Sequence, residues 1–176
     1  MRWLIDGYNV IRHSSELSSR ERESLEAGRQ ALCGLLAQAP RARGDQFIVV
    51  FDGAGGGGSA GMAGVRVIFS SARETADRVL ARMAAQGGAV VSNDREVRRA
   101  ATRAGAIAVT ADEFLVRLEA PRGFRADVGE AGDVVGSRDE PEQWASGPKK
   151  GNPRRLGKKA RAAARALRRL GARSSR

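Results

Sequence analysis

Short apolar runs alternate with longer amphipathic stretches along the first 119 residues of this 176-residue chain. Five runs of three to five residues, rich in valine, isoleucine, alanine and phenylalanine, have the length and composition of β-strands. They occupy residues 2–5, 47–51, 65–69, 89–91 and 106–109. Strands that alternate with helices form a parallel sheet whose two faces the helices cover. We therefore predict an α/β sandwich of the doubly wound type.

The stretches between the runs carry apolar residues at helical spacing. The clearest stripe consists of Ala76, Val79, Leu80, Met83 and Ala84, and weaker stripes cover 25–36, 97–104 and 114–118. Capping boxes, in which a polar residue precedes a glutamate by three positions, occur at 18–21, 71–74, 93–96 and 110–113. We expect helices to begin at these boxes.

One connection is too short for a crossover helix. Residues 52–64 contain seven glycines and join the second and third runs. The segment lacks the Gly-Lys-Ser/Thr ending of a phosphate-binding loop. We interpret it as a mobile rim of a site, without secondary structure of its own.

Counts of three residue types exclude many enzyme classes. Residues 1–148 contain no lysine, which argues against P-loop NTPases, protein kinases and Schiff-base enzymes. A single cysteine, Cys33, and a single histidine, His13, exclude zinc fingers, two-histidine ribonuclease chemistry and Cys/His nucleophile pairs. We expect Cys33 to be a core residue and His13 a surface residue. Carboxylate chemistry remains.

Aspartates follow the predicted strands. Asp6 directly follows the first strand, Asp52 follows the second, and Asp94 lies shortly after the fourth. Asp77 lies near the start of the helix after the third strand and can face the same rim. Ligands of open parallel sheets bind at the carboxyl ends of the strands, so these four acids are expected to share one pocket.

Such a cluster needs protons or a cation, because several carboxylates in a small volume repel one another. An oxygen-only donor set favours Mg²⁺ or Mn²⁺. A divalent metal activates water and stabilises charge on a phosphodiester, so the predicted chemistry is metal-assisted phosphodiester hydrolysis. Ordinary roles remain open: Asp94 as a helix-dipole residue, Asp52 and Asn9 as turn residues. Asp6 has no capping role that the sequence makes obvious.

The net charge of +11 is concentrated at the C-terminus. Residues 120–145 carry six acids and three arginines, whereas residues 146–176 carry twelve Lys and Arg and no acid. We predict a domain over 1–119, an acidic linker over 120–145 and a basic arm over 146–176. Apolar positions in the arm permit a helix over 156–170, expected to be marginal alone and ordered on a partner. Nucleic acid is the best-matched partner, and a solubilising tail is the alternative.

No run of about 18 apolar residues is present, so no membrane span is expected. The N-terminal residues reach charge within six positions and contain no apolar stretch of secretory-signal length. A cytoplasmic location is therefore expected.

Four ordered motifs carry a resemblance to a known family. They are Asp6-Gly-Tyr-Asn9-Val-Ile, Val49-Val-Phe-Asp52-Gly, Val67-Ile-Phe-Ser70 with Glu74-Thr-Ala-Asp77, and Val90-Val-Ser-Asn-Asp94-Arg-Glu-Val. Together they resemble the YacP-like branch of the NYN-domain ribonucleases, relatives of PIN-domain nucleases, over about residues 1–118. The glycine-rich segment departs from the family, and the basic arm lies outside the resemblance.

The resemblance implies a PIN-like three-layer α/β/α sandwich with a central, mostly parallel sheet, and endonucleolytic cleavage of RNA. It implies that Asp6, Asp77 and Asp94 bind Mg²⁺ or Mn²⁺, and that Asn9 and Asp52 support them. Ser92 and Asn93 are implied to place the phosphate or the metal ligands. Similar proteins act on messenger RNA in association with ribosomes.

The sequence thus predicts a metal-dependent RNA endonuclease. Basic residues expected to bind RNA are Arg73, Arg95, Arg98, Lys149, Lys150, Lys158, Lys159, Arg161 and Arg165. An RNA- or ribosome-binding module with weak or lost cleavage is the main alternative. A metal-dependent phosphatase is less favoured, because its commonest form needs a lysine that the domain lacks.

Overall fold

A computed structural model describes residues 1–40, 42, 44–53, 58–119 and 157–170. Six strands form one sheet in these ranges: β1 (Arg2–Asp6), β2 (Gln46–Phe51), β3 (Gly58–Met62), β4 (Val65–Phe69), β5 (Ala89–Val91) and β6 (Ile107–Val109). The helices are α1 (Gly7–Arg12), α2 (Ser15–Glu23), α3 (Leu25–Gln38), α4 (Ala76–Ala84), α5 (Arg95–Arg103), α6 (Ala111–Glu119) and α7 (Lys158–Leu167). None of these helices is long and apolar enough to cross a lipid bilayer.

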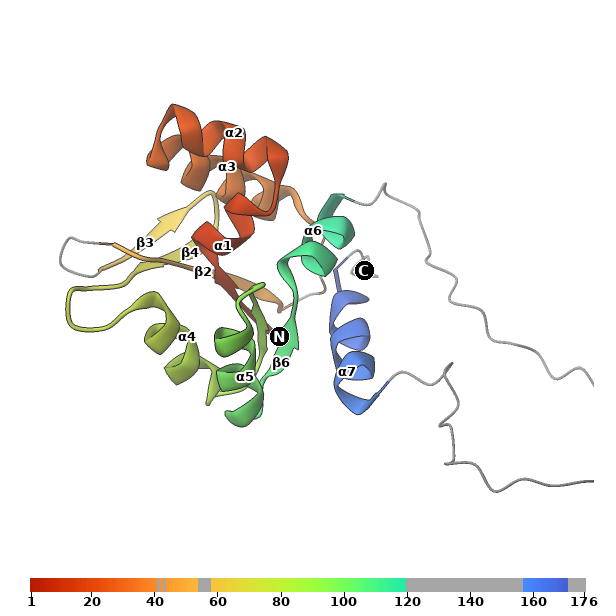
Figure 1. The fold of residues 1–176 in the computed structure, drawn as a ribbon. Coiled ribbons are helices and arrows are strands. Elements are labelled where there is room, and N and C mark those ends of the chain that lie inside the picture. Colours follow the sequence, from red (N-terminus) through yellow and green to blue (C-terminus); the bar gives the residue numbers. More distant parts are fainter. Residues whose placement is uncertain (41, 43, 54–57, 120–156, 171–176) are drawn as a thin grey trace, which may run out of the picture.

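The sheet has the order β3-β4-β2-β1-β5-β6 and is parallel except for β3, which pairs antiparallel with β4. The five predicted strands are present, and helices lie on both sides of the sheet (Figure 1). The predicted α/β fold with a central, mostly parallel sheet is therefore confirmed.

The prediction for the glycine-rich segment is wrong in part. Residues 58–62 form the edge strand β3, which is in register with β4 from Gly58 opposite Phe69 to Met62 opposite Val65. Ala63 and Gly64 turn the chain with positive φ angles of 51° and 75°. Main-chain pairing forms most of this strand, whose only large apolar residue is Met62, so no run of apolar residues marks it in the sequence.

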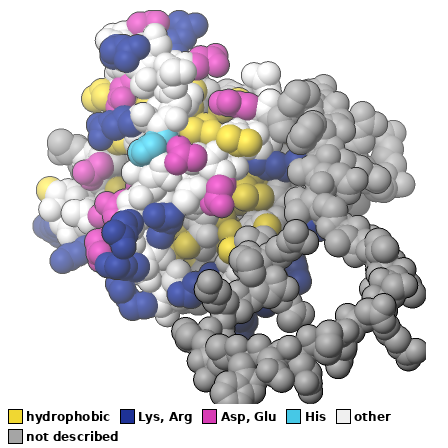
Figure 2. All heavy atoms as spheres, turned by 45° about the vertical axis from the view of Figure 1, so that its right-hand side comes forward, with side chains coloured by type: hydrophobic (Ala, Val, Ile, Leu, Met, Phe, Trp, Pro, Cys, Tyr) yellow, Lys and Arg dark blue, Asp and Glu magenta, His cyan; other side chains and the backbone are white. Residues whose placement is uncertain are grey.

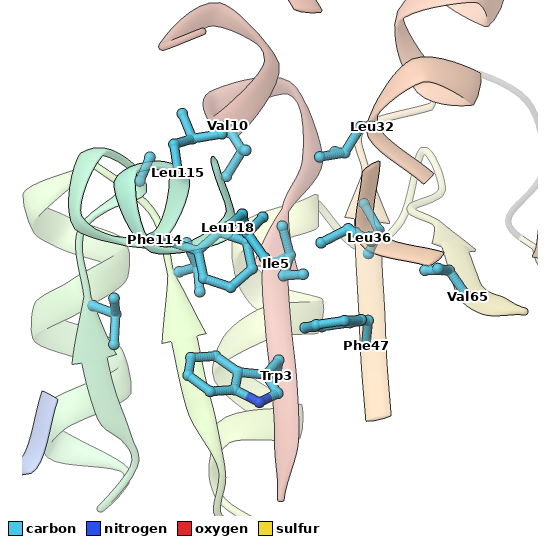
Figure 3. Packing of buried hydrophobic residues seen from close by; sticks show 14 of the residues in the cluster. Trp3, Ile5, Val10, Leu32, Leu36, Phe47, Val65, Phe114, Leu115 and Leu118 are labelled. Atoms are coloured by element: carbon cyan, nitrogen blue, oxygen red, sulfur yellow. The ribbon is translucent and has the colours of Figure 1, made fainter. Parts of the chain in front are cut away.

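Alternating side chains divide the core into two layers, as the pleat of a strand requires. Odd-numbered residues such as Trp3 and Ile5 face α1, α2, α3, α6 and α7, whereas Leu4 faces α4 and α5. Figure 3 shows the first layer, in which Trp3 packs against Phe114 with ring centroids 5.6 Å apart. Cys33 is buried there, as expected.

The helix starts agree only partly with the predicted capping boxes. Thr110 and Glu113 form a reciprocal box: each backbone N–H donates to the other's side chain at 3.1–3.2 Å. The other boxes are displaced. Ser18 lies inside α2, whose N-cap is Ser14, and the N-caps of α4 and α5 are Thr75 and Asp94 rather than Ser71 and Asn93.

Helix α7 lies within the predicted basic arm and packs against the domain. It contacts β6 and α6; Ala163 and Ala166 on the helix, and Leu170 shortly after it, are buried in the first core layer. The structure thus has a helix within the predicted range 156–170, and the expectation that the segment orders on a partner stays a prediction. Its apolar stripe has a partner within the chain. Lys149 and Lys150 lie outside the described residues.

Asp45 fastens α7 to the sheet. Its buried carboxylate accepts hydrogen bonds from Arg169 Nη2 at 2.6 Å, from Arg169 Nε at 3.1 Å and from Trp3 Nε1 at 3.4 Å. The Met1 nitrogen lies 2.6 Å from the same carboxylate. Burial alone would raise the pKa of Asp45, but these donors outweigh it and lower the pKa to about 2.

Replacing Asp45 with asparagine is expected to remove an acid-sensitive part of the stability. Because the folded-state pKa lies below the unfolded value of 3.8, the contribution is present above about pH 4 and is lost as pH falls towards 2. It amounts to roughly 2 kcal/mol. Urea unfolding at pH 7 and pH 3 should show a smaller pH dependence for Asp45→Asn than for the wild type. Equal pH dependence in both proteins would contradict the expectation.

Candidate active site

Asp6 is the central residue of the site. It ends β1 and is the N-cap of α1, so the structure gives it a capping role that the sequence did not make obvious. Its Oδ1 accepts the Asn9 backbone N–H at 3.3 Å, and its Oδ2 accepts the Ser92 hydroxyl at 2.9 Å. Both carboxylate oxygens are thereby oriented towards the carboxyl edge of the sheet.

Ser92 joins Asp6 to Asp94. The Ser92 side chain is fully buried, donates to Asp6, and accepts the Asp94 backbone N–H at 3.0 Å. A hydroxyl with no exposed surface orients other groups and does not contact RNA in this conformation. Of the two roles implied for Ser92, placing the metal ligands fits this geometry.

Asp94 caps α5, as the ordinary interpretation anticipated. Its Oδ1 accepts the backbone N–H groups of Glu96 at 2.6 Å and Val97 at 3.4 Å. This occupies one oxygen only, and the side chain is exposed. The capping role therefore leaves the second oxygen available for a ligand.

Two asparagines tie the loop after β5 to its neighbours. Asn9 Oδ1 accepts the Asn93 backbone N–H at 2.7 Å, across 84 residues of sequence. Asn93 Oδ1 accepts the Ala111 N–H, and Asn93 Nδ2 donates to Asp112, both at 2.9 Å. Asp112 is not among the site residues predicted from the sequence. Its position just after β6 was the available signal, because that strand ends at the same edge.

Asp52 lies beyond the end of β2 and is exposed. Its Oδ1 accepts the hydroxyl of Ser70, a buried residue that follows β4, and Ser70 Oγ accepts the Gly53 N–H at 3.1 Å. The two strand ends are thus joined at the rim. Ser70 belongs to one of the four sequence motifs, but the motif predicts no role for it.

The aspartates act on one another electrostatically. Burial is the largest cause that raises the pKa of Asp6, and the charges of Asp77 and Asp94 raise it further, against the hydrogen bonds from Ser92 and Asn9. Burial also raises the pKa of Asp77, and Asp94 and Asp52 add to the effect. This agrees with their positions: Asp6 ends β1, Asp52 and Asp94 follow the carboxyl ends of the neighbouring strands β2 and β5, and Asp77 lies in the first turn of α4.

The donor set fits a hard divalent cation. All four acids offer oxygen only, and none forms an ion pair with a basic side chain in the ranges that the structure describes. Among the same residues, no three His, Cys, Asp or Glu side chains are already arranged to hold a metal ion. Asp77 and Asp94 are exposed, so their rotamers can change without repacking the core.

Basic residues surround part of this edge. Arg95 follows Asp94 directly and Arg98 lies one turn later on α5, whereas Arg73 is exposed in the segment before α4. On α7, Lys158, Lys159, Arg161 and Arg165 are all exposed. Figure 2 shows basic side chains gathered low on one face, below acidic side chains around the single histidine.

Comparison with known proteins decides the family. The model of the YacP-like NYN domain matches residues 3–129. The chain belongs to this family. Two crystal structures of Rae1 (YacP) from Bacillus subtilis are similar to it, each covering 68% of this chain and 74% of theirs. The structure of a point mutant of Rae1 has 30% sequence identity to this chain and a TM-score of 0.57. The other Rae1 structure has 28% sequence identity and a TM-score of 0.55. No curated protein sequence matches the chain.

Membership of the YacP-like NYN family confirms the resemblance seen in the four motifs. It supports a nuclease-type, RNA-related activity of the hydrolase class. NYN and PIN-like nucleases usually use divalent metals, in agreement with the donor set at the sheet edge.

Proposed function

We propose that this YacP-like NYN protein is a divalent-metal-dependent RNA endonuclease. The observation that carries the proposal is the set of acids at the carboxyl edge. The charges of Asp77 and Asp94 help to raise the pKa of Asp6, the charge of Asp94 helps to raise that of Asp77, and no described basic side chain forms an ion pair with them. Such a pocket selects a cation with oxygen ligands.

Each residue has a definable part in this proposal. Asp6, Asp77 and Asp94 would hold Mg²⁺ or Mn²⁺, which supplies charge stabilisation at the phosphodiester and makes a water more acidic. Ser92 and the Asn9 backbone orient Asp6, and the Asn9 side chain fixes the loop that carries Asn93 and Asp94. Asp52 supports the rim through Ser70.

The substrate we propose is messenger RNA or RNA in ribosome complexes, the class that the family resemblance implies. Exposed Arg73 and Arg95 and the partly exposed Arg98 lie where they can contact the phosphates on either side of the bond that is cut. Such contacts position the backbone without selecting a base sequence.

Incubation of end-labelled RNA with Mn²⁺, against a control with EDTA, tests the proposal. Internal cleavage products are expected with the metal and none with EDTA. RNA that binds to the protein but stays uncut under both conditions would instead identify an RNA-binding module without cleavage.

Ser92→Ala is expected to raise the metal concentration needed for half-maximal cleavage by about 10- to 100-fold, because metal ligands depend on the groups that orient them. The substitution removes the donor to Asp6 and the acceptor of the Asp94 N–H. A metal titration of the cleavage rate measures the effect. Ser24→Ala removes the N-cap hydroxyl of α3, far from the metal ligands, and controls for the loss of a hydroxyl. Equal metal requirements in both variants would contradict the role of Ser92.

A further inference from the structure

A groove of about 860 Å³ runs along the outer edge of the sheet. Its floor is the edge strand β6, one wall is α5 and the other is the first half of α7, which flank β6 in Figure 1. Ile107, Ala108, Ala160 and Ala163 give the floor and the inner wall small apolar surfaces. The groove exists because α7 docks beside β6.

The groove starts at the candidate active site. Two lining residues mark this end of the groove. Arg95 directly follows Asp94, and Thr110 lies just after the carboxyl end of β6. Asn93, next to Asp94, bonds to Ala111 on this same side. The opposite end reaches Gly105, in the turn before β6. A strand that leaves the aspartates along α5 therefore enters the groove.

Both walls are basic. The lining contains six cationic side chains, Arg95, Arg98, Arg99, Arg103, Lys158 and Lys159, and one acidic side chain, Glu113. Glu113 is engaged by the hydroxyl and the N–H of Thr110. Arg98 Nε is buried and has no hydrogen-bond partner in the described residues. Unsatisfied donors of this kind favour an acceptor-rich ligand.

The second wall is held in place without a ligand. Arg169 bonds to Asp45, Arg117 Nε donates to the Leu167 carbonyl at 3.1 Å, and Ala163 and Ala166 are buried. A preformed wall lowers the entropic cost of binding, because the ligand does not have to order it.

We propose that single-stranded RNA leaving the aspartates binds in this groove, with its phosphates on the two basic walls and its riboses and bases over the apolar floor. The inference rests on the proposed nuclease function. Nine-residue α5 spans about 13 Å at 1.5 Å per residue. The groove is therefore long enough for a short single-stranded segment only. A peptide paired to the edge of β6 fits less well. That strand has only three residues to pair with, and the basic walls of the groove favour a polyanion.

The double variant Lys158→Glu/Lys159→Glu tests the groove. Both lysines are exposed in the first turn of α7, where acidic residues favour the helix, so the fold is expected to survive. Affinity for an unstructured oligoribonucleotide, measured in EDTA to prevent cleavage, should fall about tenfold or more. The slope of log affinity against log salt should decrease in magnitude by about 1.4, for two lost phosphate contacts. Arg20→Glu/Arg22→Glu on α2 is the matched control, since α2 lines no part of the groove.

An unchanged affinity, or an equal loss in the α2 control, would overturn the groove assignment even if Mn²⁺-dependent cleavage is present. A loss that is the same for duplex RNA would overturn the assignment to a single strand. Reduced single-strand affinity in a protein that never cleaves RNA would keep the groove and overturn the nuclease proposal.

Discussion

Replacing Asp6 with asparagine is expected to lower metal-dependent RNA cleavage by about a thousandfold or more, while the fold is retained. Removal of a charged metal ligand costs several kcal/mol of transition-state stabilisation, and each 1.36 kcal/mol is a factor of ten in rate. Asparagine caps helices as well as aspartate does, so α1 should keep its N-cap. The variant therefore removes the charge of the residue and keeps its helix-capping role.

Cleavage rates at saturating Mn²⁺ and thermal unfolding of the same preparations measure the two effects. Asp94→Asn follows the same logic at the N-cap of α5 and should behave alike. Glu16→Gln, an exposed acid on α2, is the control for loss of one negative charge. Wild-type cleavage by both aspartate variants would remove the metal mechanism.

Gly7→Ala is expected to damage both stability and activity. A Cβ at this position would lie 2.3 Å from the Phe51 ring, which is fully buried between Tyr8 and Phe69. Overpacking of this kind costs about 1–3 kcal/mol. Because Gly7 adjoins Asp6, relief of the clash moves the carboxylate, and a shift of about 1 Å can cost about a hundredfold in rate.

Gly34→Ala is the matched control for this substitution. Gly34 also lies in a helix, α3, but a Cβ there meets no atom within 4 Å. Alanine should stabilise α3 by about 0.5–1 kcal/mol and leave cleavage unchanged. Urea unfolding measures the stability of both variants, and initial cleavage rates measure their activity. A Gly7→Ala protein as stable and active as Gly34→Ala would contradict the steric argument.

The fold was predictable where side-chain periodicity determines it. Each apolar run supplied a strand whose alternate residues fill two layers, and α4 carries its apolar stripe against the sheet. Strand β3 could not be predicted, because glycine, serine and alanine have little strand preference and Met62 is its only large apolar residue, so the strand depends mainly on main-chain pairing with β4. The displaced N-caps have a local cause: neighbouring Ser, Thr, Asn and Asp residues compete for the same role.

The placement of the acids was predictable from topology, since successive parallel strands end at one edge. The contacts that orient them were not. Ser92 reaches Asp6 across 86 residues, and Asn9 reaches Asn93 across 84. Nothing in the local sequence around either residue encodes such a partner. The docking of α7 has the same origin, because Arg169 finds Asp45 across 124 residues.

The helix N-termini around the aspartates have a further consequence. Asp6 and Asp94 are the N-caps of α1 and α5, and α4 starts one residue before Asp77. Each N-terminus carries about half a positive charge from aligned peptide dipoles. The main chain thus offsets part of the mutual repulsion, and under the proposed mechanism we expect the pocket to form before a cation binds rather than to require one for folding.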